Sequence, residues 1–262
     1  MKITFLGTGT SQGVPVIACK CDVCSSSDSK DKRLRSSVLI ELNGQNLLID
    51  AGPDFRQQML RAKIEKLDAV LLTHEHKDHI GGLDDVRAFN YVMKKACDIY
   101  AEKRVHSAIK REYAYVFAEL KYPGIPKMNL HEIAEETFFI GTVAIEPIRI
   151  FHHKLPILGF KIGNCAYLTD TNLVLETKKL EGLDVLIINA LRKEKHISHF
   201  SLAESLELIK KVKPKKAFLT HISHLMGKHE VESKALPENV FFAFDEQQIV
   251  IKNGKIEIIE KI

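Results

Sequence analysis

The stretch that decides the fold is Leu71-Leu72-Thr73-His74-Glu75-His76-Lys77-Asp78-His79-Ile80-Gly81-Gly82. Four of its side chains can bind a metal ion, namely His74, His76, Asp78 and His79. The apolar run over residues 67–72 predicts a short strand before them. Gly81-Gly82 opens a turn, and residues 83–89 have helical spacing with acidic residues in the first turn. We therefore expect the histidines on a strand-to-helix loop at a strand's carboxyl end, where open α/β sheets place their sites.

The spacing within this loop predicts two metal positions. Residues two apart in an extended segment point to the same side, so His74 and His76 can bind one ion together. Asp78 and His79 follow after the chain turns, and they face a neighbouring position. The pattern H-x-H-x-D-H is much more specific than a single histidine, which favours a metal site over a solvated polar loop.

This loop, followed by two glycines, resembles the signature of the metallo-β-lactamase superfamily. The resemblance implies an α/β (α+β) fold of four layers, αββα, in which two mixed β-sheets pack face to face and helices cover their outer faces. It also implies a metal site along one edge of the sheets. The resemblance covers nearly the whole chain, and no Pro/Gly/Ser-rich linker or long repeat divides it. We therefore expect residues 1–262 to form a single hydrolase domain.

The composition is that of an ordinary globular protein, with 262 residues, 45% hydrophobic and 27% charged, and a net charge of +4. This mild charge argues against a nucleic-acid partner without excluding one. The N-terminus lacks the long apolar region of a signal peptide, and no window is apolar enough for a membrane span. We expect a cytoplasmic protein with no membrane partner. The sequence leaves a homodimer open.

Residues 19–24, Cys-Lys-Cys-Asp-Val-Cys, place three thiols close together. Thiolates prefer zinc, and a structural zinc site needs four ligands. The C-x-C-x-x-C pattern, together with Gly-Thr-Ser-Gln-Gly-Val-Pro at residues 9–15, resembles one branch of the superfamily. That branch includes the phosphoribosyl 1,2-cyclic phosphate phosphodiesterase of the carbon–phosphorus lyase pathway. The resemblance implies a structural zinc held by Cys19, Cys21, Cys24 and His224. We expect the glycine-rich loop itself to be a tight turn.

Two strand ends offer further candidates. Residues 38–50 predict a hairpin with an Asn43-Gly44 turn that ends at Asp50, and the resemblance implies that Asp50 orients a ligand histidine. Residues 142–150 predict a strand that delivers His152 and His153. Adjacent strand residues face opposite ways, so we expect one of the two to bind metal. The family pattern selects His152, whereas periodicity alone leaves His153 open.

Three more positions follow from the resemblance. Asp170 ends the strand predicted for residues 164–170 and matches a carboxylate that bridges two ions; by itself it would fit an N-cap. His221, after the strand predicted for residues 216–220, matches the last metal ligand. His199 precedes a helix start at Ser201 and resembles a histidine that contacts the substrate phosphate without binding metal. A capping or surface role fits the position of His199 as well. An unbound imidazole near a metal site can protonate a leaving group.

The resulting hypothesis is a dinuclear metal-dependent hydrolase, first of all a phosphodiesterase acting on a small cyclic or linear phosphodiester. A hydroxide bridging the two ions would be the nucleophile. The ions would be zinc or manganese, with iron as an alternative. Asp78 and His199 are the catalytic candidates. The first ion would take His74, His76 and His152, the second Asp78, His79 and His221, with Asp170 between them.

Other reactions use the same kind of site, because a fold does not fix a substrate. A thioester, lactone or β-lactam hydrolase is one alternative, and the cysteine cluster and His199 argue against it. A tRNA 3′-processing nuclease is another, but the chain shows no Gly/Pro-rich arm for gripping tRNA. An oxidoreductase of the flavo-diiron type would carry Glu at the position of His76.

Overall fold

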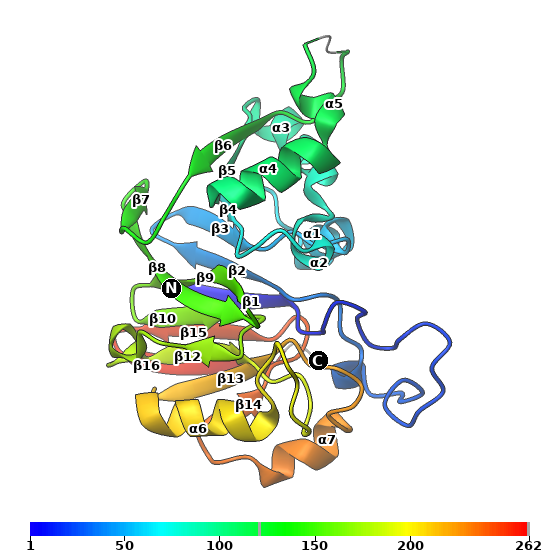
Figure 1. Ribbon diagram of the computed structural model, residues 1–262, viewed down its shortest axis with the longest axis vertical. Coiled ribbons are helices and arrows are strands. Elements are labelled where there is room, and N and C mark those ends of the chain that lie inside the picture. Colours follow the sequence, from blue (N-terminus) through cyan, green and yellow to red (C-terminus); the bar gives the residue numbers. More distant parts are fainter. Residues whose placement is uncertain (120–121, 261–262) are drawn as a thin grey trace.

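The computed structural model describes residues 1–119 and 122–260, which contain two β-sheets packed face to face (Figure 1). The first sheet has eight strands in a mixed arrangement, with parallel pairing from β3 to β6 and antiparallel pairing elsewhere. Its spatial order is β16 (Lys255–Ile259), β15 (Gln248–Lys252), β1 (Lys2–Gly7), β2 (Ser37–Leu42), β3 (Gln45–Ile49), β4 (Ala69–Leu71), β5 (Cys97–Ala101) and β6 (Met128–Glu132).

The second sheet is also mixed. Strands β10, β12, β13 and β14 pair in parallel, whereas β8, β9 and β10 pair antiparallel. Its order is β11 (Leu173–Val174), β8 (Val143–His152), β9 (Leu155–Ile162), β10 (Cys165–Leu168), β12 (Val185–Asn189), β13 (Lys216–Thr220) and β14 (Val240–Phe242), and β7 (Phe138–Ile140) pairs with β8.

Helices cover the outer faces of both sheets. Apolar side chains of α1, α3 and α4 pack on the first sheet, and those of α6 pack on the second. The helices are α1 (Phe55–Ala62), α2 (Lys77–Ile80), α3 (Arg87–Met93), α4 (Lys103–Glu112), α5 (Ala114–Phe117), α6 (Leu202–Val212) and α7 (His229–Glu232). The four-layer αββα fold expected from the sequence is confirmed.

Alternation along the strands explains why they read as continuous apolar runs. Val38 and Ile40 point into the core between the sheets, whereas Leu39 points to the helix-covered face. The same alternation places Leu47 between the sheets and Leu48 beneath the helices. Strands buried on both faces need apolar residues at every position, because neither face meets water.

Several strands end at one edge of the sandwich in a left-handed residue. Asp50 after β3 has a φ of 64°, Asp170 after β10 has 56°, and His221 after β13 has 55°. This conformation costs an L-residue roughly 1–2 kcal/mol. Each turn thereby directs a polar side chain off the end of its strand toward the same edge, and that edge carries the candidate site.

The helix boundaries differ from the sequence-based expectation in two places. The helix expected over residues 53–63 begins at Phe55, so Pro53 lies before it and not in its first turn. The helix expected from Lys103 to Leu120 is interrupted at Tyr113, whose φ of −116° and ψ of 41° are not helical. Leu120 lies outside the described residues.

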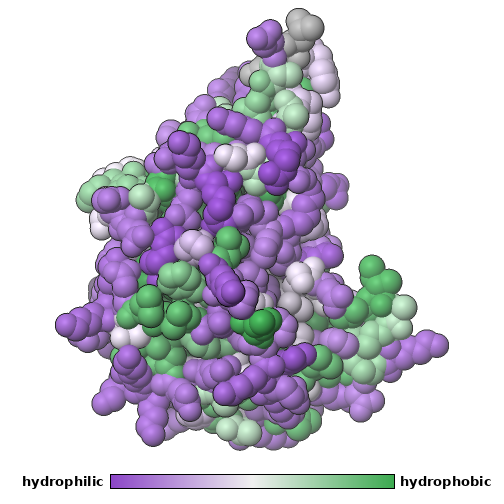
Figure 2. Space-filling model, in the orientation of Figure 1, coloured by the Kyte–Doolittle hydropathy of each residue, from purple (hydrophilic) through white to green (hydrophobic). Residues whose placement is uncertain are grey.

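The cysteine-containing loop projects from the body of the sandwich (dark blue, right of Figure 1), and hydrophobic residues gather over this projection in Figure 2. Its own core is small, with Val14, Val23 and Cys24 buried and Val16 and Cys19 packed against them. None of the helices described here combines the length and the apolar character that crossing a bilayer requires.

Candidate metal centre

The loop after β4 brings its first two histidines together. Nε2 of His74 lies 3.0 Å from Nδ1 of His76. Two nitrogens bound tetrahedrally to one zinc ion at about 2.0–2.1 Å are roughly 3.3 Å apart, so this separation is close to that of two ligands on one ion. His74 is fully buried, and its burial lowers the pKa well below the usual range. The ring is therefore neutral at pH 7, as a metal ligand must be.

Asp50 orients the second part of the loop from beneath. The buried Asp50 carboxylate accepts hydrogen bonds from the Thr73 amide at 2.9 Å and from Nδ1 of His79 at 2.7 Å. Because Nδ1 is engaged in this way, Nε2 of His79 faces the site, where it is buried and its contacts with carboxylates among the described residues lack hydrogen-bond geometry. The geometry agrees with the orienting role expected for Asp50.

Two carboxylates face the free nitrogen of His79. Its Nε2 lies 3.1 Å from an Asp78 oxygen and 3.3 Å from an Asp170 oxygen. Burial alone would lower the pKa of His79, but Asp170, Asp78 and Asp50 outweigh it and hold the pKa well above the usual range. The negative potential that raises this pKa would equally favour a metal cation at the same place.

Asp170 lies at the centre of the cluster. One of its oxygens is 3.0 Å from Nδ1 of His221, and the other is 3.9 Å from Nε2 of His74. Burial raises the pKa of a carboxyl group, but His221 and His79 outweigh that effect and hold the pKa of Asp170 well below its usual range. The carboxylate is ionised and lies between the two parts of the cluster.

The structure distinguishes between the paired histidines of β8. His152 points toward the loop, with its ring 5.1 Å from that of His76 and 5.7 Å from that of His74, while its Nδ1 lies 3.0 Å from the Ser198 carbonyl. His153 has a φ of 56° and is exposed. Of the two, His152 is the one placed to complete the first metal position.

His199 closes the other side of the cluster. Its ring lies 4.7 Å from His152 and stacks 5.0 Å from His221. Its Nδ1 is buried without a hydrogen-bond partner in the described structure. Burial lowers the pKa of His199 to about 3, so the ring is neutral at pH 7. A ligand atom of His199 is within 4.8 Å of those of His152 and Asp170, so distance alone does not separate it from the ligand candidates.

The three cysteines of the projecting loop form a second cluster with a histidine from far along the chain. Nδ1 of His224 lies 3.3 Å from Sγ of Cys19 and 3.4 Å from Sγ of Cys21, and Cys24 completes the group within 4.8 Å. Sulfur and nitrogen on one tetrahedral zinc ion are roughly 3.6 Å apart, so the group has the shape of a closed site. The Cys24 amide, and then His224, lower the pKa of Cys21 to about 6.

The chain resembles known proteins over most of its length. A family model described as a β-lactamase superfamily domain matches residues 45–222. The chain belongs to this superfamily. A crystal structure of a diphosphatase from the PhnP family is 38% identical, with a TM-score of 0.88 over 94% of this chain and 95% of the other. That likeness agrees with the branch expected from the cysteine motif.

Two further relatives resemble the chain only in part, one because it is much longer and one because it shares little sequence. The chain is 41% identical over 98% of its length to an octanoyltransferase of Porphyromonas gingivalis, of which it covers only 53%. The chain thus spans about half the length of this curated relative. The Zn²⁺-bound PqqB of Methylobacterium extorquens has a TM-score of 0.78 at 18% identity, over 96% of this chain and all of the other, and therefore shares the fold.

The donor set of this superfamily member fits divalent metal ions. Imidazole nitrogens and carboxylate oxygens from both sheets converge on one edge, and the unpartnered Nε2 of His79 lies among them. Atoms of Asp78, His79, Asp170 and His221 lie within 4.8 Å of one another. His74 and His152 adjoin this group through Asp170, and His76 lies beside both of these histidines. The arrangement fits two neighbouring positions that share Asp170.

Sequence reasoning missed three residues that hold the site together. Ser36 Oγ lies 3.2 Å from Nδ1 of His221, and Thr10 Oγ1 lies 3.3 Å from its Nε2. Thr73 Oγ1 lies 3.0 Å from Nδ1 of His74. The glycine-rich loop is therefore more than a tight turn, because it also brings Thr10 to the site. The sequence of this loop carried no signal for the contact between Thr10 and His221.

Gly52, two residues after Asp50, permits the close packing of α2. A Cβ atom added at Gly52 would overlap the backbone carbonyl of Asp78, so any larger residue would displace the helix that carries Asp78 and His79. Gly52 lies three residues after the end of β3, and it acts by its lack of a side chain.

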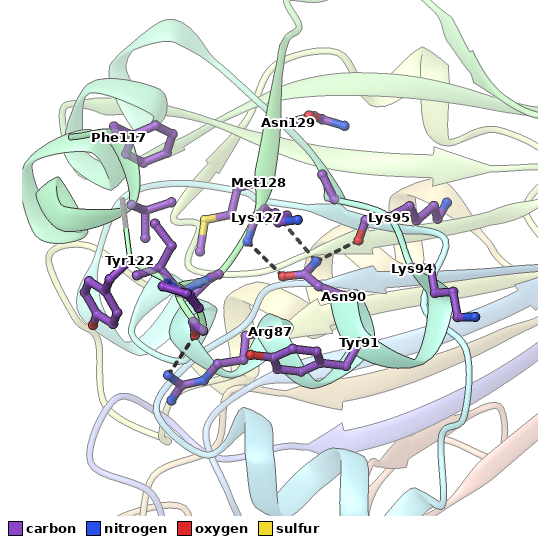
Figure 3. A pocket seen from close by; sticks show the side chains of 16 residues that line it. Arg87, Asn90, Tyr91, Lys94, Lys95, Phe117, Tyr122, Lys127, Met128 and Asn129 are labelled. Carbon is purple, nitrogen blue, oxygen red and sulfur yellow. Dashed lines mark hydrogen bonds between the residues drawn. The ribbon is translucent and has the colours of Figure 1, made fainter. Parts of the chain in front are cut away.

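A separate pocket of about 880 Å³ lies between α3, α5 and the start of β6, and it contains none of the candidate ligands (Figure 3). Lys94 and Lys95 point away from its centre in this view. The amide of Asn90 is fully engaged with the backbone of Lys95 and Lys127. Arg87 is paired with Asp84. Among the described residues that line this pocket, no catalytic groups converge.

Proposed function

We propose that the protein is a dinuclear metal-dependent hydrolase that cleaves small phosphodiesters. The observation that carries the proposal is the buried Asp170 carboxylate, which lies within 4 Å of ligand candidates of both proposed positions: His74 of the first, and His79 and His221 of the second. In this proposal His74, His76 and His152 hold one ion, and Asp78, His79 and His221 hold the other. Asp170 is shared by both.

Neighbouring residues would fix the orientation of the ligand histidines before a substrate binds. Asp50 holds the ring of His79 through Nδ1, and the Ser198 carbonyl holds the ring of His152 through Nδ1. Each ring is thereby committed to presenting Nε2 to the cluster. Divalent ions bound there would supply Lewis acidity and lower the pKa of water. Asp78, ionised beside His79, would place negative charge next to the second position.

His199 would act on the substrate and not on a metal. As a neutral imidazole it carries one N–H, which can donate a hydrogen bond to a phosphoryl oxygen. An anionic substrate beside the ring would raise its pKa and favour the imidazolium form. When water adds to phosphorus and the P–O ester bond breaks, that proton would pass to the leaving oxygen.

One comparison supports a phosphoryl substrate over a thioester, lactone or β-lactam. The 38% identical structure is described as a diphosphatase, which places phosphoryl chemistry on a chain of nearly equal length. That description also favours a second candidate, hydrolysis of a diphosphate bond at the same site. The chain covers only 53% of the octanoyltransferase, so the activity in that name is not carried over. A ribonuclease Z of Exiguobacterium, 27% identical over 62% of this chain and 48% of its own length, keeps a nuclease among the alternatives to be tested.

We further propose that residues 1–262 form one domain, because the diphosphatase is matched over 95% of its length. Five free cysteines among the described residues fit a reducing compartment such as the cytoplasm. The proposed binding partner is a small phosphodiester substrate. We propose no membrane partner. A homodimer stays an expectation from the sequence.

A substrate screen tests this proposal. Protein loaded with Zn²⁺ or Mn²⁺ should hydrolyse bis(p-nitrophenyl) phosphate and a cyclic nucleotide phosphodiester, and should leave p-nitrophenyl thioacetate and lactones unchanged. His199→Ala should lower kcat about 10²–10⁴-fold, the range of general acid catalysis. His196→Ala, whose ring lies 5.3 Å from His199, is the matched control and should retain activity. Cleavage of thioesters or lactones alone would refute the proposal.

A further inference from the structure

Glu75 separates the first two ligand candidates of the metal loop, and its side chain lies on the other side of this loop segment. His74 and His76 point toward the cluster, so the residue between them points away from it. There Glu75 forms an ion pair with Nη1 of Arg104, a residue in the first turn of α4. The loop is thereby attached to a helix that carries none of the ligand candidates.

The same guanidinium makes a second contact. Nη2 of Arg104 donates a hydrogen bond to the Pro156 carbonyl at 2.7 Å. Pro156 pairs with Phe151 across the β8–β9 hairpin, next to the pair formed by His152 and Leu155. One side chain therefore joins the loop that carries His74 and His76 to the hairpin that carries His152.

One further ion pair holds Arg104 in place. Glu102 lies 3.6 Å from Nη2 of Arg104 and 2.7 Å from Nη2 of Arg149, a residue of β8. The side chains of Arg104 and Glu75 are 33% and 22% exposed, and ion pairs of such exposure contribute little to stability. The planar guanidinium of Arg104 binds two acceptors, Glu75 and the Pro156 carbonyl, and thereby fixes the distance between the two segments that carry them.

We propose that Arg104 is a positioning residue for the first metal position, setting the distance between the His74/His76 loop and His152. The proposal rests on the metal site of the proposed function. The loop and the hairpin are also joined by a backbone hydrogen bond, from the Leu158 amide to the Thr73 carbonyl, at 3.2 Å. The second position takes its residues from α2 and the ends of β10 and β13, and Arg104 does not touch these.

Metal retention tests the proposal without a substrate. Native mass spectrometry of Zn²⁺-loaded protein titrated with a chelator should show that Arg104→Ala binds one catalytic ion about 10–100-fold more weakly, the range found for residues that support ligands. The other catalytic ion and the cysteine-bound ion should be unaffected. Arg104→Lys should fall in between, because a lysine can pair with Glu75 but cannot span both acceptors.

The chain offers a matched control on the same helix. Glu112 of α4 pairs with Lys77, the first residue of α2, at 2.6 Å, but at an exposed position, so Glu112→Gln should retain both ions with wild-type affinity. The effects of Glu75→Gln and Arg104→Ala on metal affinity should be non-additive. The double variant should bind the affected ion no more weakly than the weaker-binding single variant.

Two results would overturn the proposal: unchanged retention of both ions in Arg104→Ala, or equal loss of both. Absence of phosphodiesterase activity in wild-type protein that holds two ions would instead refute the proposed function, and the selective effect of Arg104→Ala would still support its positioning role.

Discussion

Replacement of Cys21 by serine removes one ligand of the cysteine cluster and tests whether that cluster acts on stability alone. The cluster joins Cys19, Cys21 and Cys24 to His224, about 200 residues further along the chain. In the chain-entropy treatment, a cross-link that closes a loop of this length stabilises a protein by about 5 kcal/mol. This figure is an upper bound for the cluster.

The protein already provides part of that restraint. The Thr10 amide donates to the Ile222 carbonyl at 3.2 Å, and the Ile222 amide donates to the Thr8 carbonyl at 2.9 Å. The loop's own core, however, is limited to Val14, Val23 and Cys24 as buried members. We therefore expect Cys21→Ser to lower the free energy of unfolding by about half the upper bound, ~2–3 kcal/mol. At about 2–4 °C per kcal/mol, the melting temperature should fall by roughly 4–12 °C.

Calorimetry, metal analysis and steady-state kinetics on the same preparation provide the assay. Cys21→Ser should lose one metal equivalent and the stated stability, while the folded fraction keeps a kcat near wild type, because a closed four-ligand site offers no open position to a substrate. Lys20→Ser changes an exposed neighbour in the same loop and is the control. Loss of catalysis in a Cys21→Ser protein with an unaltered melting temperature would refute the reasoning.

Three further predictions concern individual side chains. His152→Ala should abolish most activity and His153→Ala should leave it largely intact in a steady-state assay, because only His152 faces the cluster; the reverse order would show that the wrong histidine was chosen. Asp170→Asn should reduce kcat by more than about 100-fold, the upper end for residues that only support a ligand, with a smaller change in melting temperature than Cys21→Ser. In zinc-free protein, iodoacetamide should alkylate the exposed Cys21 before the buried thiols of Cys24 and Cys165. Its pKa is lowered to about 6 while burial raises that of Cys24 to about 11 and that of Cys165 to about 12. Its labelling rate, followed by mass spectrometry, should therefore fall as the pH falls through 6. Labelling of Cys24 or Cys165 first would contradict the assigned order.

Much of the fold could be predicted from local sequence. The Asn43-Gly44 turn marked the β2–β3 hairpin, and the apolar runs marked β10, β12 and β13. These signals are local, since alternation and turn chemistry depend on residues a few positions apart. The break at Tyr113 carried no such signal, because neither proline nor glycine marks it.

The candidate site could be predicted only in part for the same reason. The spacing of the residues from His74 to His79 predicts a metal site by itself. The resemblance to the superfamily supplied His152, Asp170 and His221. Thr10 and Ser36, by contrast, meet His221 across 211 and 185 residues of sequence. Contacts of that separation come from sheet topology, and a hydroxyl in a loop has no periodic pattern by which to find it. The link through Arg104 escaped prediction in the same way.

The count of metal ions bound to the purified protein tests the central claim most directly. Native mass spectrometry of wild-type protein never exposed to a chelator should find about three ions per chain, two in the His/Asp cluster and one in the cysteine cluster. Asp170→Asn should reduce occupancy in the first cluster only, and Cys21→Ser in the second only. One ion or none in the wild-type protein would contradict the two-site account.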